Sequence, residues 1–247
     1  MPSPKGGVAG VSCGTRTLCM MIFGGVVRSW NGTTWRLWSK ATGFCGGAPG
    51  PCGLASVSCG SSTNCVAVGT ITISQEPVQN AVAAMWNGRS WSRDDDLPAV
   101  GNPAQANAVS CAGPFCMATG SSSSDVAGGT VADAYSWQAA THSWTGAPLD
   151  LGNLCAEFHT CFWTSAISCA SPANCLTLGG PSGSQWWDGS GWHSARAISA
   201  GRGSALRGVS CGGSRCLAVG FRTVAGKLRT LAELWNGLAW TIITTPR

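Results

Sequence analysis

The stretch VSCGSSTNCVAVG at residues 57–69 decides the fold, because variants of it occur five times. The five copies begin at Val11, Val57, Val109, Ile167 and Val209. Their first cysteines are separated by 46, 52, 58 and 42 residues. Repeats of this size are typical of solenoids, propellers or arrays. The chain of 247 residues therefore divides into five similar units.

One unit predicts four short strands. Residues 56–59, 65–69 and 81–86 alternate or run as apolar segments between turn residues, and a fourth strand begins at Trp91. Asn87-Gly88, between the third and fourth strands, is a strong hairpin signal. The other units match this pattern, although the third replaces Asn-Gly with a longer turn.

Five quartets of sequential antiparallel strands predict an all-β fold, a five-bladed β-propeller of four-stranded antiparallel blades. A β-solenoid or two β-sandwiches are alternatives, but neither predicts a fivefold strand quartet. We expect one domain over residues 1–247. If the repeats begin at Val11 and end near Thr245, the ring closes by packing blade five on blade one, without a shared strand. Residues 1–10 could instead add to the last blade. The expected blades are 9–40, 54–95, 107–148, 164–197 and 206–246.

The cysteines of each repeat flank a turn of four or five residues, so they can face each other across a hairpin. The expected hairpin pairs are Cys13–Cys19, Cys59–Cys65, Cys111–Cys116, Cys169–Cys175 and Cys211–Cys216. The four remaining cysteines lie as two pairs of near neighbours in the sequence, which we pair as Cys45–Cys52 and Cys155–Cys161. Fourteen paired cysteines indicate an oxidising compartment. The spacing does not suit zinc, so we expect no metal and no cofactor.

The phrase Val-Ser-Cys…Cys-x-Ala-Val-Gly…Leu-Trp-Asn-Gly-x-x-Trp, best preserved at 57–91 and 209–240, resembles repeats of secreted actinobacterial proteins. That resemblance covers nearly the whole chain and implies a propeller and secretion, but no activity. In unit number and length the chain is also similar to tachylectin-type five-bladed lectins, which bind N-acetylated sugars between blades. The second likeness is architectural, because the cysteine phrase is not part of the lectin pattern.

Charge and hydropathy exclude some partners. We expect the net charge of +5 to be spread along the chain, because there is no basic run. This argues against nucleic acid as a partner. No apolar stretch is long enough for a bilayer, so no membrane insertion is expected. The start, Met1-Pro2-Ser3-Pro4-Lys5, lacks the apolar core of a signal peptide. We therefore expect a trimmed or partial chain of an extracellular protein.

Two sets of residues are candidate ligand sites. The loop at 155–163 combines Glu157, His159 and Trp163 and would form a ligand-binding or acid/base cluster; alternatively its aromatics only cap a blade. The repeated third-strand ends could form equivalent sugar sites, because aromatic faces suit sugars and amides suit hydroxyls. The alternative is that these tryptophans pack between blades and the polar residues only make turns. The residues of this second set are Trp30, Asn31, Trp86, Asn87, Trp187, Asp188, Trp235 and Asn236.

Apart from the longer third turn of the third unit, the loops that vary between units belong to one face of the predicted ring. These are the middle loops, including Thr70–Asn80, Ser121–Thr130 and Phe221–Arg229, and the links between blades. Variable loops on a rigid scaffold usually carry binding, so this face is expected to carry the site.

No zinc-protease motif, phosphate loop or dinucleotide fingerprint occurs in the chain. We therefore expect a secreted, non-catalytic, lectin-like module whose partner is a glycan or cell-surface polymer. A protein-interaction or structural module of a larger surface protein is the main alternative. A glycan-active enzyme is third, because propeller glycosidases draw their carboxylates from distant blades.

Overall fold

The structure is a computed structural model. It describes residues 8–23, 26–38, 52–73, 78–94, 97–98, 104–124, 129–138, 142–149, 164–179, 183–195 and 203–245. These residues form twenty β-strands in five separate four-stranded sheets. None of the described segments is a helix that could cross a membrane.

Each sheet is one blade, and its strands follow one another in sequence order. Blade 1 contains β1 (Val8–Thr15), β2 (Leu18–Phe23), β3 (Val26–Trp30) and β4 (Trp35–Leu37). Blade 2 contains β5 (Cys52–Ser61), β6 (Asn64–Ile73), β7 (Val78–Trp86) and β8 (Trp91–Asp94). Blade 3 contains β9 (Ala104–Ala112), β10 (Phe115–Ser124), β11 (Gly129–Gln138) and β12 (Ser143–Pro148). Blade 4 contains β13 (Thr164–Ser171), β14 (Asn174–Gly179), β15 (Gly183–Trp187) and β16 (Trp192–Ser194). Blade 5 contains β17 (Ser204–Gly212), β18 (Arg215–Val224), β19 (Lys227–Trp235) and β20 (Trp240–Ile243).

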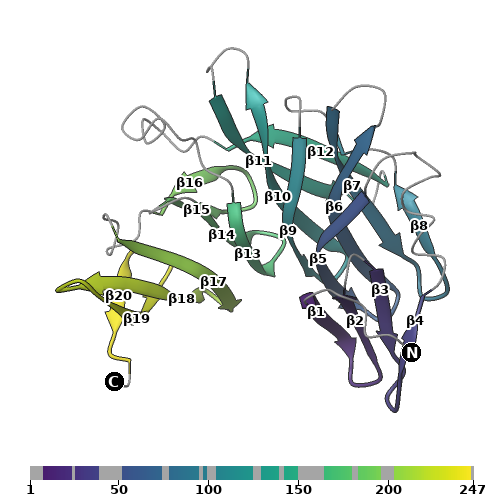
Figure 1. The fold of residues 1–247 in the computed structure, drawn as a ribbon, viewed down its shortest axis with the longest axis horizontal. Helices are drawn as coiled ribbons and strands as arrows, with labels where there is room; N and C mark the ends of the chain where they lie inside the picture. The colour runs from purple at the N-terminus through teal and green to yellow at the C-terminus, as the bar shows by residue number, and fades with distance from the viewer. Residues whose placement is uncertain are drawn as a thin grey trace.

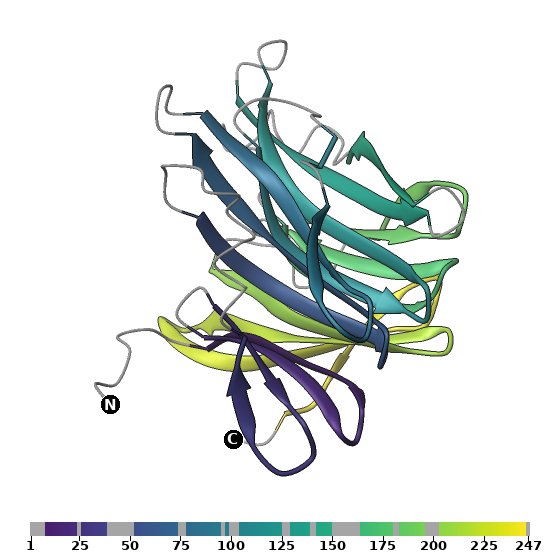
Figure 2. The ribbon, with the colours of Figure 1, turned by 90° about the vertical axis from the view of Figure 1, so that its right-hand side faces the viewer.

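The five blades form a β-propeller, as predicted. The first strands of successive blades pack side by side, β1 with β5, β5 with β9, β9 with β13 and β13 with β17. Figure 2 shows the sheets arranged face to face as a fan of blades. Five blades of four antiparallel strands confirm the predicted fold class.

The expected closure of blade five on blade one was wrong. In Figure 1, β17–β20 and β1–β4 lie at opposite ends of an arc and are separated. Among the described residues, the strands of blade 5 pack closely on blade 4 but not on blade 1. Successive blades are joined by one repeated kind of junction. The five blades joined by these four junctions form an open arc.

That repeated junction is apolar and uses alternate residues of the second strand. In blade 2, Val66 and Val68 face blade 3, whereas Cys65 and Ala67 face blade 1. The equivalents in blade 4 divide in the same way, with Leu176 packing toward blade 5. Strand alternation therefore gives every blade one face for its predecessor and one for its successor.

A serine of the repeat adds a hydrogen bond to each junction. Its hydroxyl accepts from the backbone N–H of the first cysteine of the next blade, always at 2.9 Å. The four donor–acceptor pairs are Cys59–Ser12, Cys111–Ser58, Cys169–Ser110 and Cys211–Ser168. The second residue of the Val-Ser-Cys phrase is thus a specific contact between blades.

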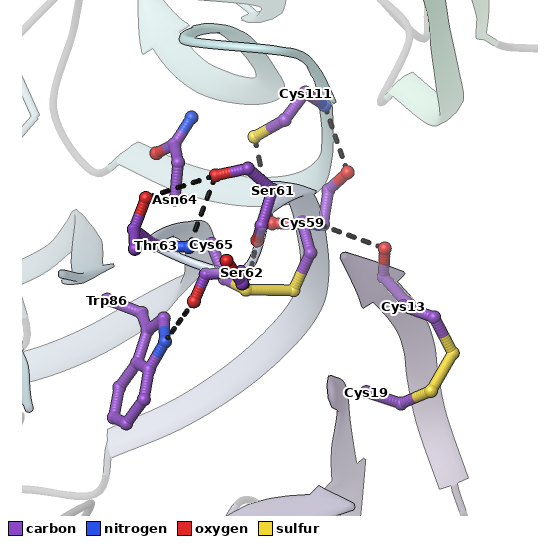
Figure 3. The surroundings of a disulfide bond; sticks show 12 residues. Cys13, Cys19, Cys59, Ser61, Ser62, Thr63, Asn64, Cys65, Trp86 and Cys111 are labelled. Carbon is purple, nitrogen blue, oxygen red and sulfur yellow. Dashed lines mark hydrogen bonds between the residues drawn. A yellow bond between two sulfur atoms is a disulfide. The ribbon is translucent and has the colours of Figure 1, made fainter. Parts of the chain in front are cut away.

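The five hairpin disulfides are confirmed. Each joins directly opposite residues of the first and second strands, with Cα atoms 3.8–4.1 Å apart. Figure 3 shows two of them, Cys13–Cys19 and Cys59–Cys65, in neighbouring blades. The pairings Cys45–Cys52 and Cys155–Cys161 lie outside the described side chains. Every confirmed bond lies within one blade.

The predicted middle loops are partly strand. Residues Thr70–Ile73, Ser121–Ser124 and Phe221–Val224 continue the second strands of blades 2, 3 and 5, and the third strands begin correspondingly early. Loops were expected here because these stretches vary between units, but pairing with the third strands supplies ladder hydrogen bonds that keep the backbone extended. In blade 5 the described connection is a turn of two residues, Ala225 and Gly226.

The glycine that ends the repeat phrase also has a structural reason. An extra residue in the first strand of blade 3 forms a bulge opposite Thr119 and Gly120. A Cβ on Gly120 would lie 1.8 Å from the carbonyl oxygen of Gln105. Only glycine lets the bulged strand approach this closely.

Candidate ligand-binding groove on blade 5

The predicted cluster of Glu157, His159 and Trp163 lies outside the described residues. This cluster therefore stays a prediction.

The repeated tryptophans stand in cross-strand pairs at the ends of the third and fourth strands. In each blade their ring centroids are 5.5–5.8 Å apart and the planes are tilted by 48–54°. Trp86 and Trp235 are buried in the junctions with the preceding blades. Trp187 packs against the junction of blades 3 and 4, whereas Trp30 is half-buried on blade 1. These rings lie mostly between blades, where a sugar face would have to displace a neighbouring blade.

The polar residues after these tryptophans hold the turns. The Asn87 side-chain oxygen accepts from the backbone N–H groups of Arg89 and Ser90, at 3.0 and 2.9 Å. The corresponding oxygens of Asn31, Asp188 and Asn236 accept in the same way. The acceptor atoms of this set are thus already engaged by the backbone.

Asp188 has an additional partner. Its Oδ2 lies 2.7 Å from Nε2 of His193, and both side chains are partly exposed. Hydrogen bonds from Ser190, with further ones from Gly191 and His193, hold the pKa of the Asp188 carboxyl well below its ordinary value. This hydrogen-bonded pair lies at the tip of a turn.

A groove of about 700 Å³ lies on blade 5, beside the turn between β18 and β19. Strands β18, β19 and β20 supply its lining, which combines cationic, hydroxyl and aliphatic side chains. The residues that line it include Arg222, Val224, Leu228, Arg229, Thr230 and Ile242. This turn belongs to the face expected to carry binding, and Ala225 and Gly226 form it with φ values of 48° and 73°.

Two arginines dominate the electrostatics of the groove. Arg222 and Arg229 are directly opposite residues in the β18–β19 ladder, and both are exposed. Like charges directly opposite each other in a sheet are destabilising. Among the described residues, neither Arg222 nor Arg229 has a carboxylate within 4 Å; the ion-pair contact found there joins His193 and Asp188. The groove therefore presents two uncompensated guanidinium groups.

The expectation of evenly spread charge was wrong. Residues 203–245 contain five basic residues and one acidic residue, and residues 8–38 contain three basic residues and no acidic one. Residues 41–201 contain three basic and nine acidic residues. The excess positive charge thus lies in the two end blades. A count by repeat would have found it, because each repeat is one blade.

A second polar group is buried between blades 2 and 3. Asp133 and Tyr135 are fully buried, and the Tyr135 hydroxyl lies 3.4 Å from Oδ2 of Asp133. Burial raises the pKa of Asp133 to about 6. This group is closed to solvent. The described side chains contain no cluster of three or more potential metal ligands.

Comparisons with known proteins support the fold. No family model and no curated protein sequence matches the chain. Among solved structures, "YCF48 bound to D1 peptide" matches with a TM-score of 0.55 and 9% identity, covering 98% of this chain and 68% of that one. Phage phi92 endosialidase matches with a TM-score of 0.58 and 8% identity, covering 99% and 58%. The GH74 xyloglucanase from Xanthomonas campestris matches with a TM-score of 0.52 and 10% identity, covering 88% and 41%.

The chain shares the β-propeller fold with these proteins. At 8–10% identity, the likeness shows fold and not activity. The chain spans less than two thirds of the endosialidase and xyloglucanase chains. The similar structures include both binding proteins and enzymes that act on glycans.

Proposed function

We propose that this propeller is an extracellular, non-catalytic module that binds an acidic glycan in the groove of blade 5. The observation that carries the proposal is the directly opposed pair Arg222 and Arg229 without a carboxylate partner in the described structure. Two guanidinium forks side by side suit carboxylates, which arginine binds in a bidentate manner.

The other lining residues agree with a sugar ligand. Thr244 offers a hydroxyl group to sugar hydroxyls, and Val224 and Ile242 offer aliphatic surface for the ring faces. The hydroxyl groups of Thr230 and Thr245 bond to each other at 2.9 Å across the same lining. The volume of about 700 Å³ is within the range of small-ligand sites. Extracellular placement is supported by the five disulfides, since such bonds persist in oxidising compartments.

The test is a calorimetric titration with an oligosaccharide of uronic acids, with the neutral oligosaccharide of the same length as reference. We expect binding of the acidic ligand to weaken with salt. Replacing both arginines, as Arg222→Gln with Arg229→Gln, should weaken it at least about tenfold, because charge-assisted hydrogen bonds are lost. Arg89→Gln is the matched control, since Arg89 is an exposed arginine on the turn after Trp86, in another blade.

Equal binding of both oligosaccharides, or binding that the double substitution leaves intact, would refute the proposal. An acidic peptide tests the alternative of a protein-interaction module, which the exposed aliphatic side chains Val224 and Leu228 favour. Preference for that peptide, or for a single-stranded oligonucleotide, would replace the glycan. Release of new reducing ends from the oligosaccharide would show a glycan-active enzyme.

A further inference from the structure

Exposed large apolar side chains occur only in the two end blades of the described structure. In blade 1 they are Val8, Val11, Trp35 and Leu37. In blade 5 they are Leu217, Val219, Val224, Leu228, Leu238, Ile242 and Ile243. Several of them occupy repeat positions whose equivalents are buried between blades.

Val11 shows this for blade 1. The first residue of the repeat phrase packs against the preceding blade, and Val57, Val109 and Ile167 are only 5–8% exposed there. Val11 has the same place in its blade but is 58% exposed. The face of blade 1 that would receive a preceding blade is therefore open.

Leu217 and Val219 show the converse for blade 5. The equivalent residues of blade 2, Val66 and Val68, are fully buried against blade 3. Leu217 and Val219 are 41% and 47% exposed. The face of blade 5 that would receive a following blade is open as well.

The hydrogen bond of the junction has its acceptor on the open face of blade 5 and its donor on the open face of blade 1. Ser210 is the blade 5 equivalent of the serines that accept from the next blade, and no such donor reaches it among the described residues. Cys13 is the blade 1 equivalent of the cysteines whose N–H groups donate to such a serine. Gly60 closely approaches blade 3, whereas a Cβ on Gly212 would meet nothing within 4 Å. Each end of the arc thus carries one unfilled half of the junction.

We propose that blade 5 of one copy packs onto blade 1 of a second copy, forming the same junction that joins blades within the chain. The second copy fits because it carries the complementary half: Val11 to cover Leu217 and Val219, and a Cys13 N–H for Ser210. The contact is continuous with four junctions already present in the structure. The contact joins two different faces, so a dimer still has an open blade 1 face at one end and an open blade 5 face at the other. Association therefore extends beyond a dimer unless the copies close into a ring.

Charge sets the conditions for this association. Both end blades carry excess positive charge, so the two faces repel each other at low ionic strength. Salt screens this repulsion without weakening the apolar contact. Association should therefore increase from about 0.05 to about 0.5 M salt, opposite to the salt response expected for the acidic ligand.

The experiment is analytical ultracentrifugation of the wild type, Val11→Lys and Leu217→Lys. The wild type should form oligomers that grow with concentration, and each variant alone should be monomeric. An equimolar mixture of the two variants should form a 1:1 dimer and nothing larger, because one intact junction remains. Leu238→Lys is the control, since Leu238 is 89% exposed on the turn before β20 and should associate like the wild type.

Three results would overturn the proposal. A wild type that stays monomeric at high salt would mean that its faces cover each other or need another partner. A single variant that still self-associates would place the contact elsewhere. A mixture that fails to form the dimer, although both variants keep the wild-type circular dichroism, would rule out the head-to-tail junction.

Discussion

Tyr135 donates a 3.4 Å hydrogen bond to Oδ2 of Asp133, and both side chains are completely buried on the face of β11 toward blade 2. Oδ1 of Asp133 has no hydrogen-bond partner among the described residues. The carboxylate is thus only half satisfied, and its desolvation outweighs the hydrogen bond that stabilises its charge.

This pair predicts how stability depends on pH. The pKa of Asp133 rises from 3.8 to about 6 on folding, so the folded chain holds more protons between these values. Stability should therefore fall as pH rises from 4 to 6 and stay lower above 6, by about 3 kcal/mol. Asp133→Asn should abolish this fall and be more stable than the wild type at pH 7.5 in urea unfolding. A less stable Asn variant at that pH would show that the carboxylate is well solvated or paired.

The close approach at Gly120 predicts a large cost for a single methyl group. Gly120→Ala would place Cβ against the carbonyl oxygen of Gln105 and should lower the free energy of unfolding by about 1–3 kcal/mol. Gly53→Ala is the control, because the added Cβ has open space and should be nearly neutral. Thermal unfolding of both variants checks this, and equal melting temperatures would contradict the strand bulge.

The arginine pair predicts opposite effects on stability and binding. Arg222→Glu would turn a repulsive cross-strand pair with Arg229 into an attractive one and should stabilise blade 5 by about 0.2–1 kcal/mol. The same change should abolish binding of the acidic oligosaccharide. Chemical unfolding and calorimetry on one preparation measure both effects. Loss of stability together with binding would instead indicate general damage to the hairpin.

The polar turn residues, such as Asn87, are expected to contribute to stability and not to ligand binding. Asn87→Ala removes an acceptor from the backbone N–H groups of Arg89 and Ser90 and should cost about 1 kcal/mol. The titration with acidic oligosaccharide should be unchanged. A variant of normal stability that binds sugar poorly would revive the repeated tryptophan–asparagine sites.

The fold was predictable because one phrase encodes one hairpin. The cysteine spacing specified directly opposite residues, and Asn87-Gly88 specified the next turn, so the strand quartet followed from local chemistry. The strand lengths were missed at Ser121–Ser124, where a stretch that varies between units pairs with β11. The open arc was missed too, because the angle between blades depends on packing of residues distant in sequence.

The groove could not be predicted without the register of β18 against β19. Arg222 and Arg229 are seven residues apart, and they become neighbours only because β18 and β19 pair around the Ala225-Gly226 turn. That two-residue turn was a signal present in the sequence, but the segment was interpreted as a loop. That the variable face carries binding stays a prediction, as does the ligand site in the loop around Glu157 and His159.

The five confirmed disulfides have a mechanical consequence. Each joins neighbouring strands of one blade, so none of them carries load from one blade to the next. A pulling force on the two ends of the chain would be resisted between blades by apolar contacts and side-chain hydrogen bonds, such as those of the repeat serines and of Asn64 and Asn174. Blades would then detach and unravel one at a time, starting from the open ends of the arc, while each short disulfide loop stayed locked. Under tension the molecule would lengthen in steps of about one repeat.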